Sequence, residues 1–148
     1  MYKKMEQAIK TAQKAYAKNE VPIGAVIFKD GKAVCSAHNK SISKNNSLAH
    51  AEILAIQKAL KKLNTTYLQG CELYVTVEPC MMCMGSIINA RISKLVYGVS
   101  EAKTGFADSV ANVRSFSVCN NIEIYAGIRE EECRQLMVNF FKTLRDKQ

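Results

Sequence analysis

The stretch of sequence that decides the fold reads Cys71-Glu72-Leu73-Tyr74-Val75-Thr76-Val77-Glu78-Pro79-Cys80-Met81-Met82-Cys83. Its first seven residues, through Val77, are rich in side chains that favour strands and predict a central strand of a sheet. Pro79 suits the first turn of a following helix, because a proline lacks the N–H group that would be unpaired there. Cys80 and Cys83 are three residues apart, so their thiols are expected on one face of that helix.

A second helix is predicted over residues 49–62, with His50 and Glu52 in its first turn. His50, Cys80 and Cys83 together are three zinc-type ligands. A structural zinc site uses four protein ligands, whereas a hydrolytic site uses three and leaves one position for water. Helix N-termini also favour thiolate over thiol. The sequence therefore predicts one catalytic Zn²⁺ per chain.

Glu52 is two residues from His50, and residues at that offset do not share a helix face. Its carboxylate is therefore expected beside the open position of the metal, as a proton carrier. Each residue alone also has a plainer interpretation: Glu52 as a solvated helix residue, His50 as a partly buried histidine, and Cys-x-x-Cys as a redox pair or half of a structural zinc site. The sequence contains no second Cys-x-x-Cys and no His-x-x-x-His, so the combination favours the catalytic site.

Hydrophobic periodicity predicts helices over 2–18, 49–62, 79–89 and 129–145, and strands over 23–28, 33–37, 71–77, 94–99 and 122–126. Asp30-Gly31 predicts a hairpin turn, and Ser47 is a candidate cap for the second helix. Residues 100–121 show no period, and their length indicates a functional loop with short helical pieces. Helices alternating with strands imply an α/β fold, a three-layer α/β/α sandwich around a mixed five-stranded sheet, in a single domain over 1–148.

The last helix is expected to bury a stripe formed by Cys133, Leu136, Met137, Phe140 and Leu144.

Composition narrows the class of protein further. Hydrophobic residues make up 48% and charged residues 23%, and no segment approaches a membrane span. The first sixteen residues lack the apolar core of a secretory signal, so we expect the protein in the cytoplasm, with the remaining cysteines reduced. The net charge of +8 suits a polyanionic partner, although lysine-rich solvated faces are common.

His-x-Glu followed by Pro-Cys-x-x-Cys is the signature of zinc-dependent nucleobase deaminases. The chain resembles the bacterial-type tRNA-specific adenosine deaminases, which belong to the cytidine deaminase superfamily. The resemblance covers nearly the whole chain and is carried by Val21-Pro22-Ile23-Gly24-Ala25-Val26, Ala49-His50-Ala51-Glu52-Ile53, Val77-Glu78-Pro79-Cys80-Met81-Met82-Cys83, Arg91-Ile92, Ala102-Lys103-Thr104-Gly105, Glu131-Glu132-Cys133 and Phe140-Phe141. It implies a cytidine deaminase-like fold.

The resemblance also implies a reaction: deamination of adenosine to inosine at the wobble position of a tRNA anticodon loop. Zinc-bound hydroxide would attack C6, and Glu52 would carry the protons. Asn39 is expected to hydrogen-bond the base, and Val21 to line the pocket. Glu101, Lys103 and Phe141 are expected to meet the anticodon stem-loop, whereas Phe140 is expected in the core. Family members form homodimers.

Two other functions remain open from the sequence. Deaminases of free bases or nucleosides, such as guanine, cytosine or cytidine, share the zinc signature. A non-catalytic, zinc-stabilised RNA-binding module would share the metal ligands, but it would have no use for Glu52. The chain has Asn39-Lys40-Ser41 where the family commonly has Asn-Arg-Pro, and Glu101 where the family commonly has aspartate.

Overall fold

A computed structural model describes residues 1–147. The helices are α1 (Tyr2–Ala17), α2 (Ala51–Leu63), α3 (Met81–Asn89) and α4 (Glu130–Asp146), and the strands are β1 (Gly24–Lys29), β2 (Lys32–His38), β3 (Cys71–Val77), β4 (Lys94–Val99) and β5 (Glu123–Tyr125). Two short 3₁₀ helices, η1 (Val113–Ser115) and η2 (Ser117–Cys119), lie between β4 and β5. The predicted loop with short helical pieces is confirmed.

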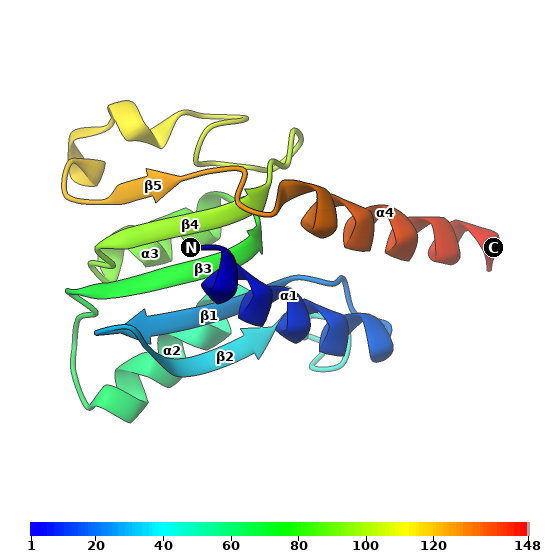
Figure 1. Ribbon diagram of the computed structural model, residues 1–148, viewed down its shortest axis with the longest axis horizontal. Helices are drawn as coiled ribbons and strands as arrows, with labels where there is room; N and C mark the ends of the chain where they lie inside the picture. Colours follow the sequence, from blue (N-terminus) through cyan, green and yellow to red (C-terminus); the bar gives the residue numbers. More distant parts are fainter. Residues whose placement is uncertain (148) are drawn as a thin grey trace.

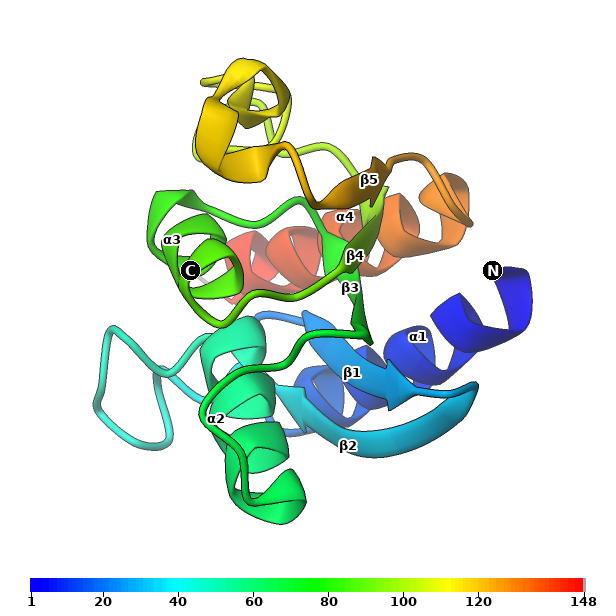
Figure 2. The same cartoon turned by 90° about the vertical axis from the view of Figure 1, so that its left-hand side faces the viewer.

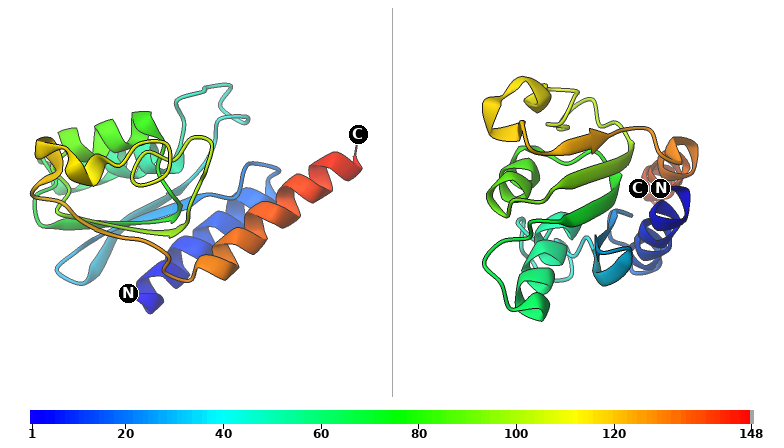
Figure 3. Two further views of the ribbon diagram at one scale, coloured as in Figure 1. Left: turned by 90° about the horizontal axis from the view of Figure 1, so that it is seen from above. Right: turned by 60° about the vertical axis from the view of Figure 1, so that its left-hand side comes forward.

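The five strands form one mixed sheet in the order β2-β1-β3-β4-β5. β1 pairs antiparallel with β2 and β3, whereas β3, β4 and β5 run parallel. α2 and α3 cover one face of the sheet, and α1 and α4 lie side by side on the other (Figures 1, 2 and 3). The predicted three-layer α/β/α sandwich with a five-stranded mixed sheet is confirmed.

β3 is buried on both faces, as its position in the middle of the sheet requires. Successive side chains of a strand point to opposite faces. Leu73 and Val75 pack in the cluster under α2 and α3, and Tyr74 packs in the cluster under α1. The hairpin turn is also confirmed: Asp30 and Gly31 both have positive φ angles, 51° and 80°, as a two-residue turn between antiparallel strands needs.

The predicted starts of two helices are corrected by the structure. α2 begins at Ala51 with His50 as its N-cap, and Ser47 does not cap it. α3 begins at Met81 with Cys80 as its N-cap, so Pro79 precedes the helix. Both cap residues have extended backbone angles, and neither makes a capping hydrogen bond with its side chain. This backbone conformation leaves the imidazole and the thiol free to face each other.

The buried stripe of α4 is shorter than predicted. Cys133 and Phe140 are buried, whereas Leu144 is 45% exposed because the end of α4 extends past the sheet (Figure 1). β2 is an edge strand of the sheet. Lys58 and Lys62 of α2 donate hydrogen bonds to the carbonyls of Ser36 and Val34 in this strand. These lysines cover an edge strand that would otherwise offer unpaired groups. Over residues 1–147, no helix has the length and apolar character needed to cross a membrane.

Candidate metal centre and active-site pocket

The N-termini of α2 and α3 bring His50, Cys80 and Cys83 together. Their donor atoms all lie within 4.8 Å of one another. His50 Nδ1 is 3.6 Å from the sulfur of Cys80 and 3.5 Å from that of Cys83. Cys80 and Cys83 follow His50 by 30 and 33 positions in the sequence. The fold brings the three residues into one cluster that could bind a metal ion.

The two thiols of the cluster differ in acidity. Hydrogen bonds from Cys83 and His50 lower the pKa of the Cys80 thiol to about 4. Donation to Cys80, together with burial, raises the pKa of the Cys83 thiol. The hydrogen bond with Cys80 likewise raises the pKa of His50. A thiolate already stabilised beside an imidazole is the kind of donor set that accepts a cation.

Glu52 lies in the first turn of α2 and is 4% exposed. Burial raises the pKa of its carboxyl group to about 7. A carboxyl group that titrates near neutral pH can both accept and donate a proton. Glu52 therefore differs from the solvated helix residue that remained an alternative from the sequence.

A cavity of about 270 Å³ opens beside the cluster. Four residues that the sequence assigned to substrate contact line this cavity: Val21, Asn39, Glu101 and Phe141. His50, Glu52 and Cys80 line it too, whereas Cys83 does not. Phe141 is 39% exposed, whereas Phe140 is buried, as predicted. Lys103 is exposed at a neighbouring turn and is not part of the lining.

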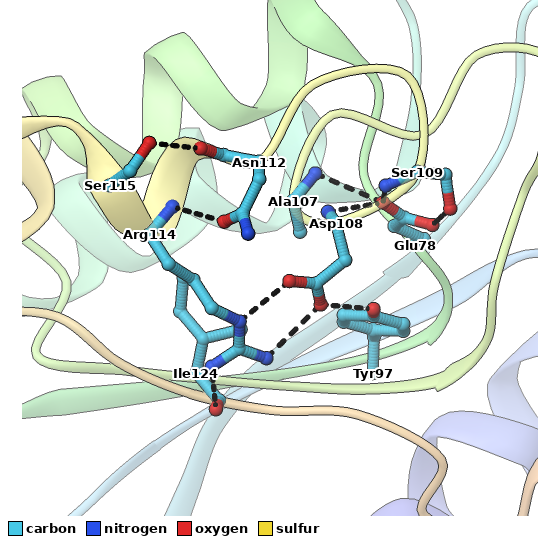
Figure 4. Close-up of polar contacts among 9 residues, drawn as sticks. All are labelled: Glu78, Tyr97, Ala107, Asp108, Ser109, Asn112, Arg114, Ser115 and Ile124. Carbon is cyan, nitrogen blue, oxygen red and sulfur yellow. Dashed lines mark hydrogen bonds and ion pairs between the residues drawn. The ribbon is translucent and has the colours of Figure 1, made fainter.

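Glu78 is a residue of this site that sequence reasoning missed. Its buried carboxylate accepts hydrogen bonds from the backbone N–H groups of Ala107, Asp108 and Ser109 and from the Ser109 hydroxyl (Figure 4). It also accepts one from the backbone N–H of Glu101. Burial alone would raise the pKa of Glu78, but these hydrogen bonds outweigh it and lower the pKa. The carboxylate therefore fixes the loop that carries Glu101 over the pocket.

Gly105 allows this arrangement. Its N–H donates to the carbonyl of Glu101, and it forms an isolated bridge with Cys80. A Cβ at this position would meet the Glu78 carboxylate and would lie 2.5 Å from the carbonyl oxygen of Glu101. Only glycine fits between the two.

A second contact fixes the far part of the same loop. Asp108 accepts a hydrogen bond from the Tyr97 hydroxyl at 2.6 Å (Figure 4). It also forms an ion pair with Arg114, whose Nε lies 2.6 Å from the carboxylate. Arg114 also donates to the carbonyl of Ile124, at 2.7 Å, in β5. Tyr97 lies in β4 and Ile124 in β5, so this contact ties the middle of the loop to both of the strands that flank it.

Known deaminases are similar to this chain over nearly its whole length. The family model described as MafB19-like deaminase matches residues 2–145. A tRNA-specific adenosine deaminase of Rickettsia felis is 45% identical over 144 residues, covering 95% of this chain and 100% of the relative. One of Bacillus subtilis is 42% identical over 144 residues, covering 97% of this chain and 89% of the relative.

Two solved structures extend the comparison. One comes from studies of A-to-I editing by tRNA:A34 deaminases and has a TM-score of 0.85 at 38% identity, covering 89% of this chain and 96% of that chain. A guanine deaminase from Bacillus subtilis has a TM-score of 0.63 at 38% identity, covering 65% of this chain and 62% of that chain.

The fold, the His/Cys/Cys cluster and the family match define the class of the protein as a deaminase. Within this class, near full-length identity above 40% decides the family. The chain belongs to the family of tRNA-specific adenosine deaminases, as the sequence resemblance indicated.

Proposed function

We propose that this protein converts adenosine to inosine by hydrolysis at the wobble position of a tRNA anticodon loop. The observation that carries the proposal is one cavity lined by two residues of the metal-type cluster, by a buried glutamate and by Asn39. The relatives that share almost the entire chain are named tRNA-specific adenosine deaminases, and the structure with a TM-score of 0.85 comes from studies of A-to-I editing at the wobble position. The whole chain, 1–148, is proposed as one deaminase domain.

Zinc is the metal we propose, bound by His50, Cys80 and Cys83. Tetrahedral zinc, with bonds of about 2.0–2.1 Å to nitrogen and about 2.3 Å to sulfur, would hold these atoms about 3.6 Å apart. The observed separations of 3.6 Å and 3.5 Å fit that distance. When bound, zinc supplies an acidified water at its fourth position, so a nucleophile forms at neutral pH.

Glu52 would move the protons of the reaction. Its carboxylate accepts a proton as water adds to C6 of the adenine ring, and delivers it to ring N1. A second proton passes through Glu52 to the exocyclic amine, which leaves as ammonia while C6 becomes a carbonyl carbon. General acid–base catalysis of this kind typically contributes about 10²–10⁴-fold in rate.

The remaining lining residues would position the base. Asn39 is buried and carries an amide, which can pair with the edge of a base. Val21 and Phe141 supply apolar contacts to its faces. A duplex would hide C6 in the base stack, so we propose that the substrate base is turned out of a single-stranded loop.

A purine base without RNA is the second candidate substrate. The guanine deaminase structure that is 38% identical over part of the chain favours it. Guanine would need the same displacement of an amine from a ring carbon, and the cavity has room for a single base.

The test is incubation of zinc-loaded protein with an anticodon stem-loop that carries a wobble adenosine, followed by nucleoside analysis. We expect inosine from the parent protein. Glu52→Gln should retain zinc and lose about 10²–10⁴-fold in rate. Normal turnover by Glu52→Gln would refute the proton-carrying role, and ammonia from guanine with no inosine from RNA would favour the second candidate.

Two further proposals concern where the protein acts and how it assembles. We propose that the protein acts in the cytoplasm, where the four cysteines outside the metal cluster would stay reduced. We also propose that it forms a homodimer, as its family does. Sedimentation of the purified protein tests the second point.

A further inference from the structure

The loop between β2 and α2 has a net positive charge, and three of its residues, Asn39, Ser41 and His50, line the pocket. Residues 39–50 include Lys40 and Lys44 and contain no aspartate or glutamate. The N–H of Lys44 donates to the carbonyl of Lys40 at 2.9 Å, so the two lysines are one turn apart. Lys40 stands between two residues of the cavity lining, Asn39 and Ser41.

A buried carboxylate holds this loop in place. Glu20 is 1% exposed and accepts hydrogen bonds from the backbone N–H groups of Ile42, at 3.0 Å, and Ser43, at 2.7 Å. Both donors lie between Lys40 and Lys44, so the lysines are presented by a fixed loop. Glu20 follows the end of α1, which brings Lys18 to the same place.

These lysines repel one another. Partial burial lowers the pKa of Lys40, and so do the positive charges of Lys58, Lys44 and Lys18. In the part of the chain that the structure describes, none of the four forms an ion pair. Like charges held together without an ion-pair partner repel one another, and a bound anion would reduce that repulsion.

We propose that Lys18, Lys40 and Lys44, here called the lysine rim, bind the sugar–phosphate backbone of RNA beside the base that occupies the pocket. The proposal rests on the proposed function and adds a contact to it. A base turned out of a loop brings its own 5′ and 3′ phosphates to the mouth of the pocket. Lysine side chains bind phosphates as mobile point charges, without reading the base.

The rim makes a quantitative prediction about salt. For single-stranded nucleic acid, each neutralised phosphate contributes about 0.7 to the slope of log affinity against log salt concentration. Lys40→Gln/Lys44→Gln should therefore lower that slope by about 1.4 and weaken binding about 25-fold at 0.1 M salt. Lys18→Gln/Lys44→Gln, at exposed positions, should give a similar loss without a change in packing.

The matched control is Lys3→Gln/Lys32→Gln. It removes the same charge from the start of α1 and from the β1–β2 hairpin, away from the pocket. Binding is measured by titration of two RNAs at several salt concentrations: the stem-loop with a wobble adenosine, and the same stem-loop with a wobble uridine. The control should keep the parent's slope with both.

The outcomes separate this proposal from the proposed function. Equal slopes for the rim variants and the control would overturn the lysine rim, even if the parent makes inosine. A lower slope for the rim variants alone would support the rim, even if no inosine formed and the proposed reaction failed. A parent protein that binds neither RNA would overturn both.

Discussion

At the scale of single residues, two adjacent phenylalanines of α4 have different environments. Phe140 is buried and packs edge-on against Tyr16, with ring centres 5.9 Å apart, whereas Phe141 is partly exposed and lines the pocket. Phe141→Ala should weaken stem-loop binding by about 1–3 kcal/mol, the usual contribution of a base stacked on an aromatic ring. Phe140→Ala should instead lower the free energy of unfolding by about 3 kcal/mol.

The measurement for this pair is RNA titration beside thermal or urea unfolding of both variants. Zinc content should be unchanged in Phe141→Ala, because its side chain is not part of the metal cluster. Loss of stability without loss of RNA binding in Phe141→Ala would assign this ring to the core and not to the substrate.

The residues that carry a motif could be predicted from the sequence, and those that depend on burial could not. His50, Cys80 and Cys83 have a spacing that few alternatives share, and the structure brings them together. Glu20 precedes one stretch that carries the family resemblance and Glu78 lies within another, but nothing in the sequence shows which backbone groups either carboxylate binds. Their roles arise because the fold surrounds each carboxylate with backbone N–H groups from a distant loop.

At the scale of elements, the loop from β4 to β5 should respond to a single methyl group. Gly105→Ala places a Cβ against Glu78 and the carbonyl of Glu101, so the loop that carries Glu101 has to shift. We expect a loss of about 1–3 kcal/mol in stability, as for other overpacked sites, and at least a tenfold loss in kcat/KM with the stem-loop.

The control for this change is Gly85→Ala in α3. A Cβ there has nothing within 4 Å, and alanine favours a helix over glycine by about 1 kcal/mol. Gly85→Ala should therefore be slightly more stable than the parent and equally active. Equal activity in Gly105→Ala would show that the fixed position of this loop is unimportant for the reaction.

Strands were predicted more closely than the starts of helices. Residues 71–77 and 94–99 match β3 and β4 to the residue, because both runs are rich in valine, tyrosine and other side chains that favour strands. The starts of α2 and α3 were predicted two residues early. Cap positions usually favour side chains that bond the helix N-terminus, but here they hold metal-type ligands, so the usual signals are absent.

At the scale of the whole molecule, the order of the strands explains where the site lies. β1 begins, and β2, β3 and β4 end, at the same edge of the sheet, since Gly24 pairs with His38 and Val77 with Val99. The segments that supply Val21, Asn39, Cys80 and Glu101 leave the sheet at this edge. Two layers of helices then enclose a pocket whose parts are far apart in the sequence.

This arrangement predicts that the proposed zinc stabilises the entire fold. The metal would join the N-termini of α2 and α3 and bind the folded chain only. At a free zinc concentration of about 100 times Kd, binding adds about 2.7 kcal/mol to the free energy of unfolding. For a chain of 148 residues, that corresponds to a rise of about 5–10 °C in Tm. Calorimetry of chelated and zinc-replete protein measures it. Glu52→Gln should keep this rise, because its carboxylate is not a ligand, and His50→Ala should lose it; the same rise in His50→Ala would mean that zinc stabilises the protein at another site.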